Sequence, residues 1–298
     1  MTSKHIILTL LLMLCPIGMA AQSTISRNKP KPAVTKPKPA AKPKAKPKPA
    51  PRRNSTHHSS STSGTVSLSA EFNKLINDMV YVSGGTFTMG GTSEQGSDAA
   101  SDEKPTHSVT LSSYYICKYE VTQALWRAVM GSNPSNFIGD NLPVEQVSWD
   151  DCQTFINRLN SYTGRNFRLP TEAEWEFAAR GGNYSRHYKY SGSNYIGDVA
   201  WYEDNCGNRT HPVGTKQANE LDLYDMSGNV YEWCSDWYDS YSSYSQSNPT
   251  GPNSESCRVI RGGSWVFSAS YCRSSHRNYR PPSYCDPNLG LRLVLSHL

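Results

Sequence analysis

The feature that most constrains the fold of this chain is a tract of prolines and lysines in its first quarter. Residues 27–53 read RNKPKPAVTKPKPAAKPKAKPKPAPRR and contain eleven basic and no acidic residues. Because alternating prolines favour extended polyproline II backbone and like charges repel, the tract predicts a semi-rigid spacer. Residues 54–64, NSTHHSSSTSG, continue it as a flexible polar linker. Only the chain from about residue 66 onward is left to build a globular domain.

The first 21 residues have the pattern of a secretory signal. Lys4-His5 precedes an apolar run at residues 6–14, which is too short to span a bilayer, and small residues follow at cleavage-type positions. Export permits disulfides, and the seven cysteines left after cleavage are an odd number, so at least one thiol is free or paired outside the chain. We expect an exported protein, periplasmic or on the cell surface, with no transmembrane segment after cleavage. Its parts are a signal at 1–21, a linker at 22–65 and a domain at 66–298.

Charge is divided unevenly between these parts. The formal net charge is +5, but residues 54–298 hold eighteen basic and twenty-five acidic residues, a net of −7. An acidic domain on a basic tether favours contact between the linker and an anionic envelope surface, and argues against nucleic-acid binding.

Periodicity within the domain predicts a small α+β fold with two or three short helices, twisted antiparallel strands and much irregular structure. The helices are expected at residues 69–79, at 123–130 after the cap Thr122, at about 149–160 after Ser148, and from Thr171 to the terminator Gly181. The strands are expected as a hairpin over 80–89 that turns at Ser83-Gly84-Gly85, a strand at 109–121, and two C-terminal strands at 258–261 and 290–295.

A long segment without periodicity separates the two C-terminal strands. It begins at Gly262-Gly263, a pair that marks a bulge or the close approach of another group to the backbone. Irregular segments of this length are usually functional, and rigid aromatics mixed with Ser, Asn and Arg are typical of binding surfaces. The alternative is a polar loop that is simply solvated. We expect a surface that binds a protein or a glycan through Phe267, Tyr271, His276, Tyr279, Arg280 and Tyr284.

Several ordered motifs carry a resemblance to a known family. They are MVYVSGGTFTMG at 79–90, YEVT at 119–122, PV at 143–144, VSW at 147–149, RLPTEAEWE at 168–176, GNVYEW at 228–233, RGGSW at 261–265 and LGLR at 289–292. The pattern resembles the formylglycine-generating enzyme, or sulfatase-modifying factor, family over about residues 79–295. The resemblance implies a variant of the C-type lectin fold whose C-terminal loops form the working face. It also places Ser264 and Asn288 at pocket positions, where each could instead cap a turn.

For the enzymes of this family, the resemblance implies a copper(I) ion between two cysteine thiolates, which activates oxygen to convert a substrate cysteine to formylglycine. In the motif the second cysteine is Cys272, and Phe267 stands in place of the first. One thiolate cannot make a two-coordinate site, so copper is not expected. We expect a non-catalytic ligand-binding or scaffold module of the cell envelope that uses residues 264–288. The alternative is an oxidase-like enzyme that acts on a cysteine of sulfatases through Cys272, with Cys285 as the other thiol of the segment.

The resemblance further implies a structural calcium ion. Its ligands would be the carboxylates of Asp225 and Glu232 with the carbonyls of Gly228 and Val230, a set of hard oxygen donors that suits calcium. The alternative is that Asp225 caps a turn and Glu232 pairs with an arginine.

A last hypothesis concerns the composition of the C-terminal segment. Residues 266–288 contain no Lys, Glu, Gln, Met or Trp. Random mutation of adenines in asparagine codons cannot produce those residues, and such mutation creates the hypervariable loops of retroelement-diversified proteins that share this fold. A Ser- and Tyr-rich loop can also show this bias by chance. Hypervariability of the segment is therefore a second, narrower form of the binding hypothesis.

Overall fold

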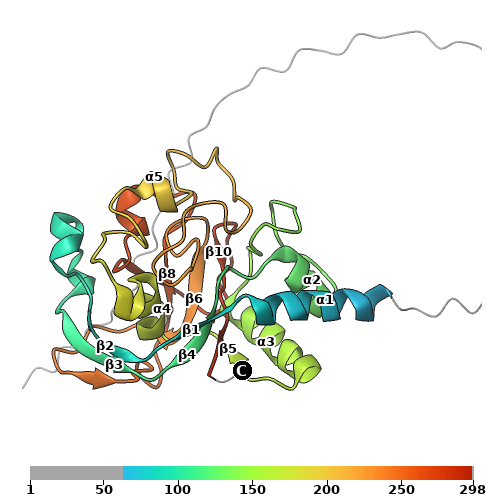
Figure 1. Cartoon of the computed structure of the whole chain (residues 1–298), viewed down its shortest axis with the longest axis horizontal. Helices are drawn as coiled ribbons and strands as arrows, with labels where there is room; N and C mark the ends of the chain where they lie inside the picture. The colour runs from blue at the N-terminus through green and yellow to red at the C-terminus, as the bar shows by residue number, and fades with distance from the viewer. Residues whose placement is uncertain (1–62, 297–298) are drawn as a thin grey trace, which may run out of the picture. The chain divides into compact units, whose positions relative to one another are not determined.

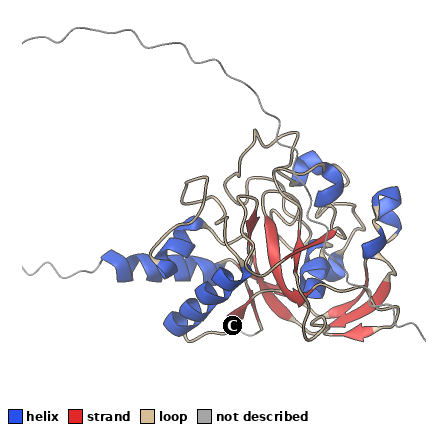
Figure 2. Ribbon diagram, turned by 180° about the vertical axis from the view of Figure 1, so that it is seen from behind, coloured by secondary structure: helices blue, strands red, loops and turns tan. Residues whose placement is uncertain are grey.

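The computed structural model of this chain describes residues 63–296, and their side chains from residue 68 onward. Short helices surround three small sheets, which confirms the predicted α+β class (Figures 1 and 2). The predicted signal, and the linker up to residue 62, lie outside the described residues. No helix in the described range is both long and apolar enough to cross a membrane.

The helices follow their local capping signals. α2 begins after Thr122, whose hydroxyl accepts a hydrogen bond from the Leu125 amide. Ser148 and Thr171 each form a capping box with the acidic residue three positions later, and so begin α3 and α4. These predicted starts are confirmed, and α3 continues three residues beyond its expected end. The helices are α1 (Ser63–Asn77), α2 (Gln123–Met130), α3 (Trp149–Thr163), α4 (Glu172–Ala179) and α5 (Ile196–Val199).

The strands form three sheets. The first has the order β1-β4-β11-β5, the second β10-β6-β8-β9 and the third β2-β3-β7. Two pairings, β10 with β6 and β3 with β7, are parallel, and the others are antiparallel. The strands are β1 (Met79–Val82), β2 (Gly85–Met89), β3 (His107–Leu111), β4 (Tyr114–Cys117), β5 (Phe167–Arg168), β6 (Tyr231–Trp237), β7 (Gln246–Ser247), β8 (Arg258–Arg261), β9 (Arg277–Arg280), β10 (Leu289–Gly290) and β11 (Val294–Leu295).

Two strand predictions near the N-terminal end of the domain are wrong. β1 and β2 form no hairpin, because β1 pairs with β4 and β2 with β3 in different sheets. The strand expected at 109–121 is correspondingly two strands that separate at Ser112-Ser113. The segment that joins β1 to β2 contacts the segment that joins β3 to β4. A Cβ at Gly84 would lie 2.4 Å from the Leu111 carbonyl oxygen. The glycine pattern therefore marks a close crossing of two chain segments and no turn.

The C-terminal part also differs from expectation. The predicted strand 258–261 is β8, but the strand expected at 290–295 is divided between β10 and β11 in two sheets. The segment expected to be irregular contains a 3-10 helix, η4 (Ala269–Cys272), and the strand β9, which pairs with β8 in the register Arg261↔Arg277. The local sequence shows no periodicity that predicts β9, because β9 is stabilised by its pairing with the distant strand β8.

The core lies on both sides of the central strands. α1, α2 and α3 group together at one side of the domain, where Trp126 and Phe155 stack with their ring centroids 4.8 Å apart (Figure 1). α4 lies between the second and third sheets, and every one of its residues is buried. Because three of them are glutamates, this helix requires cationic partners in the interior.

Candidate functional site

The site begins where β8 ends in Gly262-Gly263. Both glycines have positive φ, 98° and 73°. A Cβ on Gly263 would lie 2.7 Å from the Cys272 sulfur and 2.7 Å from the Tyr271 carbonyl oxygen, so only glycine lets η4 approach the backbone here. The predicted close approach at this pair is confirmed. η4 is thereby held directly above the end of β8.

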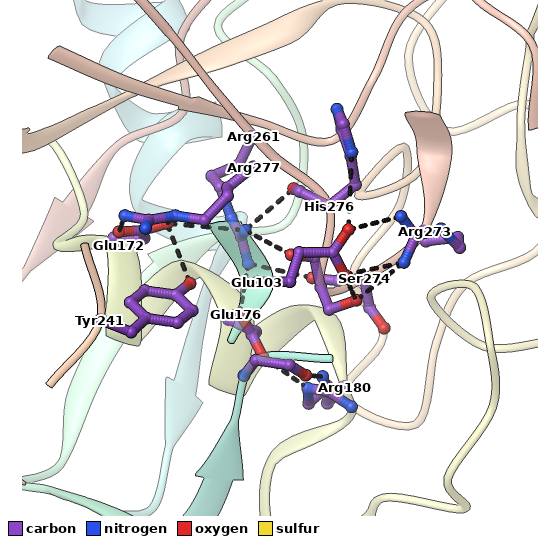
Figure 3. Close-up of polar contacts among 12 residues, drawn as sticks. Glu103, Glu172, Glu176, Arg180, Tyr241, Arg261, Arg273, Ser274, His276 and Arg277 are labelled. Carbon is purple, nitrogen blue, oxygen red and sulfur yellow. Dashed lines mark hydrogen bonds and ion pairs between the residues drawn. The ribbon is translucent and has the colours of Figure 1, made fainter. Parts of the chain in front are cut away.

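Three buried arginines of the C-terminal part bind three buried glutamates from elsewhere in the chain (Figure 3). Sequence reasoning missed this network, and the signal in the sequence was three glutamates spaced two residues apart in the helix expected from Thr171. The pairs are Arg261 with Glu176, Arg273 with Glu103, and Arg277 with Glu172. Because each buried cation is paired with a buried anion, their attraction offsets the free-energy cost of removing the charges from water.

Arg261 also holds the backbone of the segment. Its Nη1 donates to the carbonyl oxygens of Ser275 and His276 at 2.9 Å each, and its Nη2 donates to the Ser274 carbonyl oxygen at 3.1 Å. Arg273 donates to Glu103, which also accepts from the Ser275 hydroxyl. The stretch from Cys272 to Ser275 is consequently buried, and only the residues on either side of it reach the surface.

Four outward residues form an aromatic face, defined as Phe267, Tyr271, Arg280 and Tyr284. Tyr271 and Tyr284 are exposed, and Phe267 and Arg280 are half-buried. Tyr279 is half-buried too but lies on the other side of β9, where its ring packs 4.3 Å from that of Tyr238, because successive residues of a strand point to opposite faces. The Phe267 ring contacts Tyr271 at a centroid distance of 5.1 Å, and the Arg280 guanidinium lies 5.3 Å from the Tyr284 ring centroid. Asn288 is half-buried as well, and its backbone N–H donates to the Asp286 Oδ1.

Two residues predicted to line this surface lie largely inside. Ser264 is fully buried, so its assignment to the surface is wrong. The His276 side chain is only 12% exposed and its Nδ1 lies 3.8 Å from Glu103. Both side chains face inward because Arg261 and the Gly262-Gly263 turn draw this backbone into the interior.

Beneath the aromatic face, several buried polar atoms lack partners. Among the described residues none makes a hydrogen bond with the Ser264 hydroxyl, the Tyr231 hydroxyl or the His276 Nε2. Tyr231 packs edge-on against Phe267 with the ring centroids 5.4 Å apart. Because unsatisfied buried polar atoms are costly, their concentration at one place is typical of a functional site.

The copper chemistry does not fit the residues present. Phe267 occupies the position of the first ligand and fills it with an apolar ring. Burial raises the pKa of the Cys272 thiol to about 12, so without a metal the group is a neutral thiol at neutral pH. Cys285 is exposed, whereas Cys272 is fully buried, and all seven cysteines within residues 63–296 are free.

The predicted calcium loop has an incomplete set of free donors. Both carboxylate oxygens of Glu232 accept from the Arg292 guanidinium, and one also accepts from the Trp175 indole at 2.7 Å. The alternative interpretation, that Glu232 pairs with an arginine, therefore describes this residue. In the described range, no group of three or more His, Cys, Asp or Glu side chains is arranged to hold a metal ion.

Asp225 is nevertheless suited to a cation. Its Oδ2 accepts from the Gly214 amide at 2.7 Å, whereas its Oδ1 is buried and finds no hydrogen-bond partner among the described residues. Burial raises the pKa of Asp225 to about 6. Burial, with the charges of Asp225 and Glu232, also raises the pKa of Glu120, which accepts from the Val230 amide. Three buried carboxyl groups face one guanidinium, so their full ionisation would require a cation as well as Arg292.

Comparison with known proteins places these observations in a family. Residues 65–297 match the model of the sulfatase-modifying factor enzyme 1-like domain. The chaperone protein LppX of Paenibacillus barcinonensis is 37% identical over 286 residues, which cover 79% of this chain and 93% of that protein. The formylglycine-generating enzyme of Mus musculus is 32% identical over 77% of this chain, and the match spans only 64% of the mouse protein.

Solved structures agree with the sequence comparisons. The Treponema denticola variable protein 1 superposes with a TM-score of 0.68 at 34% identity, over 74% of this chain and 95% of that one. PvdO from Pseudomonas aeruginosa superposes with a TM-score of 0.65 at 29% identity, over 74% of this chain and 94% of that one.

Proposed function

This chain belongs to the sulfatase-modifying factor family, and from that premise we propose that it is a non-catalytic ligand-binding module of the cell envelope. The ligand, a protein or a glycan, contacts the aromatic face. The observation that carries the proposal is the Phe267 ring, which stands where a thiolate is required and packs between Tyr231 and Tyr271. Rigid aromatics and arginine supply much of the binding energy at protein surfaces.

The names of two relatives support a binding role. One is called a chaperone protein and one a variable protein, so domains of this kind are not confined to formylglycine formation. Formylglycine-generating enzymes are relatives too, and Cys272 is retained, so an oxidase-like activity is the second candidate.

Two measurements separate these candidates. We expect no mass change in a sulfatase-type cysteine peptide incubated with the protein, copper and oxygen. We also expect binding to a glycan array or to envelope protein fractions, with a loss of about 2 kcal/mol or more when Tyr271, Arg280 and Tyr284 are all replaced by Ala. The control is Tyr162→Ala, which removes a 59% exposed tyrosine on α3. Peptide conversion that Cys272→Ser abolishes would replace the binding proposal with the enzymatic one.

Hypervariability of the segment is the narrower form of this proposal. The structure separates residues 266–288 into buried anchors, such as Arg273 and Arg277, and outward side chains, such as Val266 and Tyr271. We expect variation between alleles to fall on the outward side chains and to spare the anchors. An imperfect repeat of this coding segment near a reverse-transcriptase gene would support the idea, and a complete genome that lacks both would remove it.

We also propose that a calcium ion stabilises the loop before β6. The buried, unpartnered Asp225 Oδ1 is its principal ligand, and the excess of buried carboxylates over Arg292 provides the negative charge. Glu232 is occupied by Arg292 and Trp175, so the carbonyls of Gly228 and Val230 are the other protein donors. The ion's role is structural, because it neutralises charge that the interior otherwise carries.

A further inference from the structure

A cavity of about 390 Å³ opens at a place that no residue of the aromatic face lines. Its walls come from the end of β6, the start of α4, the start of β3 and the connection between β6 and β8. Asp239 and Ser240 at its rim are exposed, so the cavity is open to solvent. Its volume is that of a small-molecule site.

Asp236 is the polar group built into this cavity. The residue is only 4% exposed. Its Oδ2 accepts from the Glu172 amide at 3.1 Å, at the N-terminus of α4, and from the Ser235 hydroxyl at 2.9 Å. Among the described residues no donor reaches its Oδ1, although the side chain lines the cavity. This oxygen is open to the cavity, and so it is free to accept a hydrogen bond from a ligand there.

The charges around the cavity indicate the charge of the ligand group that would donate to Asp236. Its lining contains the carboxylates of Glu172, Asp236 and Asp239 and the single guanidinium of Arg277. Arg277 is already committed, because it donates to both oxygens of Glu172 at 2.8 and 2.6 Å. The free carboxylate charge therefore belongs to Asp236 and Asp239, and it favours a cation.

The remaining walls suit an alkyl chain. Met89, Ala173, Pro249 and Pro252 present apolar surface to the same space. We propose that this cavity binds a small primary alkylammonium group, which donates to the Asp236 Oδ1 while its stem lies against Met89 and Pro249. An ammonium has three donors and no acceptor, and so matches one free carboxylate oxygen and its solvated rim. The group can belong to a free amine or to a lysine side chain.

The test is a calorimetric titration of the full chain with n-butylamine at about pH 8, where the amine is protonated, in a buffer free of amines. We expect n-butylamine to bind and n-butanol, its neutral counterpart, to bind at least about tenfold more weakly. A parallel titration with Nα-acetyl-lysine amide distinguishes the sources: binding of both compounds means that a lysine side chain fits, and binding of butylamine alone means a free amine. Equal affinity for the amine and the alcohol, or no binding of the amine, would overturn the proposal.

Asp236→Asn keeps an acceptor for the Glu172 amide and removes the charge. It should lower the affinity for butylamine at least about tenfold, whereas Asp140→Asn, an exposed carboxylate paired with Arg127, should leave it unchanged. Wild-type affinity in Asp236→Asn would contradict the assignment.

A measurement on wild-type protein covers the case in which Asp236→Asn does not fold. Butylamine should shift the NMR signals of His107, which lines this cavity, and leave those of His187, which lines a different one. Shifts at His187 alone, or at neither histidine, would overturn the proposal. Because protonation of Asp236 removes the negative charge that binds the ammonium group, the affinity for butylamine should decrease as the pH is lowered. The charged and titratable groups that face Asp236 or line the same cavity are Glu172, Glu174, Asp239, Arg168, Arg258, Arg277, His107 and Tyr241.

Discussion

At the scale of single residues, buried ion pairs hold the C-terminal segment in place. Burial acts to raise the pKa of Glu103, but the nearby His276, 3.8 Å away, and hydrogen bonds from Arg273 and Ser275 outweigh it and hold that pKa far below its ordinary value. A carboxyl group whose pKa is lowered on folding stabilises the protein above its unfolded pKa, and this contribution is lost as the pH falls. The network is therefore intact at neutral pH and weakens in acid.

Arg273→Met tests the energetic weight of the network. Removing the guanidinium leaves Glu103 buried without its principal partner, and such losses cost about 3–5 kcal/mol. The matched control is Arg127→Met in the exposed Arg127–Asp140 pair, where the loss should stay below about 1 kcal/mol. Urea unfolding measures both, and similar losses in the two variants would contradict a stabilising role for the buried pair.

Asp236 has the opposite pH dependence. Burial, together with the charge of Glu172, raises the pKa of Asp236 to about 7. A carboxyl group with a raised folded pKa binds a proton that the unfolded chain releases, so its contribution to stability falls as the pH rises from about 4 to about 7, by at most about 1.4 kcal/mol per pH unit. Relative to wild type, Asp236→Asn should therefore gain stability as the pH rises from about 5 to about 8. Thermal unfolding at both pH values checks this, and a constant difference between the two proteins would refute it.

At the scale of elements, the Gly262-Gly263 turn decides where the aromatic face lies. Replacing Gly263 with Ala would place a methyl group 2.7 Å from the Cys272 sulfur and the Tyr271 carbonyl oxygen, at a φ of 73°. Gly131 at the end of α2 has a similar φ of 79° but nothing within 4 Å of its added Cβ.

The two alanine variants therefore separate backbone strain from collision. Gly131→Ala should cost about 1 kcal/mol, which is the strain of a left-handed alanine. Gly263→Ala should cost clearly more and should weaken ligand binding, because η4 must move. Equal melting temperatures for the two variants would mean that the close approach of η4 has no energetic consequence.

The loop before β6 gives a second prediction at this scale. If calcium binds beside Asp225, chelation should lower the melting temperature, because a ligand present at a hundred times its dissociation constant adds about 2.7 kcal/mol. Asp225→Asn should abolish the chelator effect. An unchanged melting temperature, with no calcium in the purified protein by elemental analysis, would eliminate this site.

For the whole molecule, we expect the basic tract, and not the acidic domain, to contact an anionic envelope surface. Replacing the eight lysines of residues 27–53 with Gln should reduce sedimentation with anionic vesicles, because each basic residue near such a surface contributes about 1 kcal/mol. The melting temperature of the domain should not change. Loss of vesicle binding by the wild-type chain in high salt is the expected control, and salt-independent binding would contradict an electrostatic contact.

Features that depend on neighbours along the chain could be predicted from the amino-acid sequence. The starts of α2, α3 and α4 follow from Thr122, Ser148 and Thr171, because a capping hydrogen bond closes within three residues. The ordered motifs, the α+β class and the absence of a cysteine at Phe267 were likewise legible. None of these features requires knowledge of which distant segments meet.

The remaining features depend on contacts between segments that are distant in the chain. The Gly84 turn and the irregular segment were misread because strand partners such as β8 and β9 are chosen by packing over a distance in the chain. Ser264 was assigned to the surface and Arg273 was overlooked because burial of a polar group is a property of its surroundings. The free Oδ1 of Asp236 could not be predicted, because α4, β6 and β9 come together around it only in the folded chain. A missing hydrogen-bond partner can be recognised only when all neighbouring groups are known.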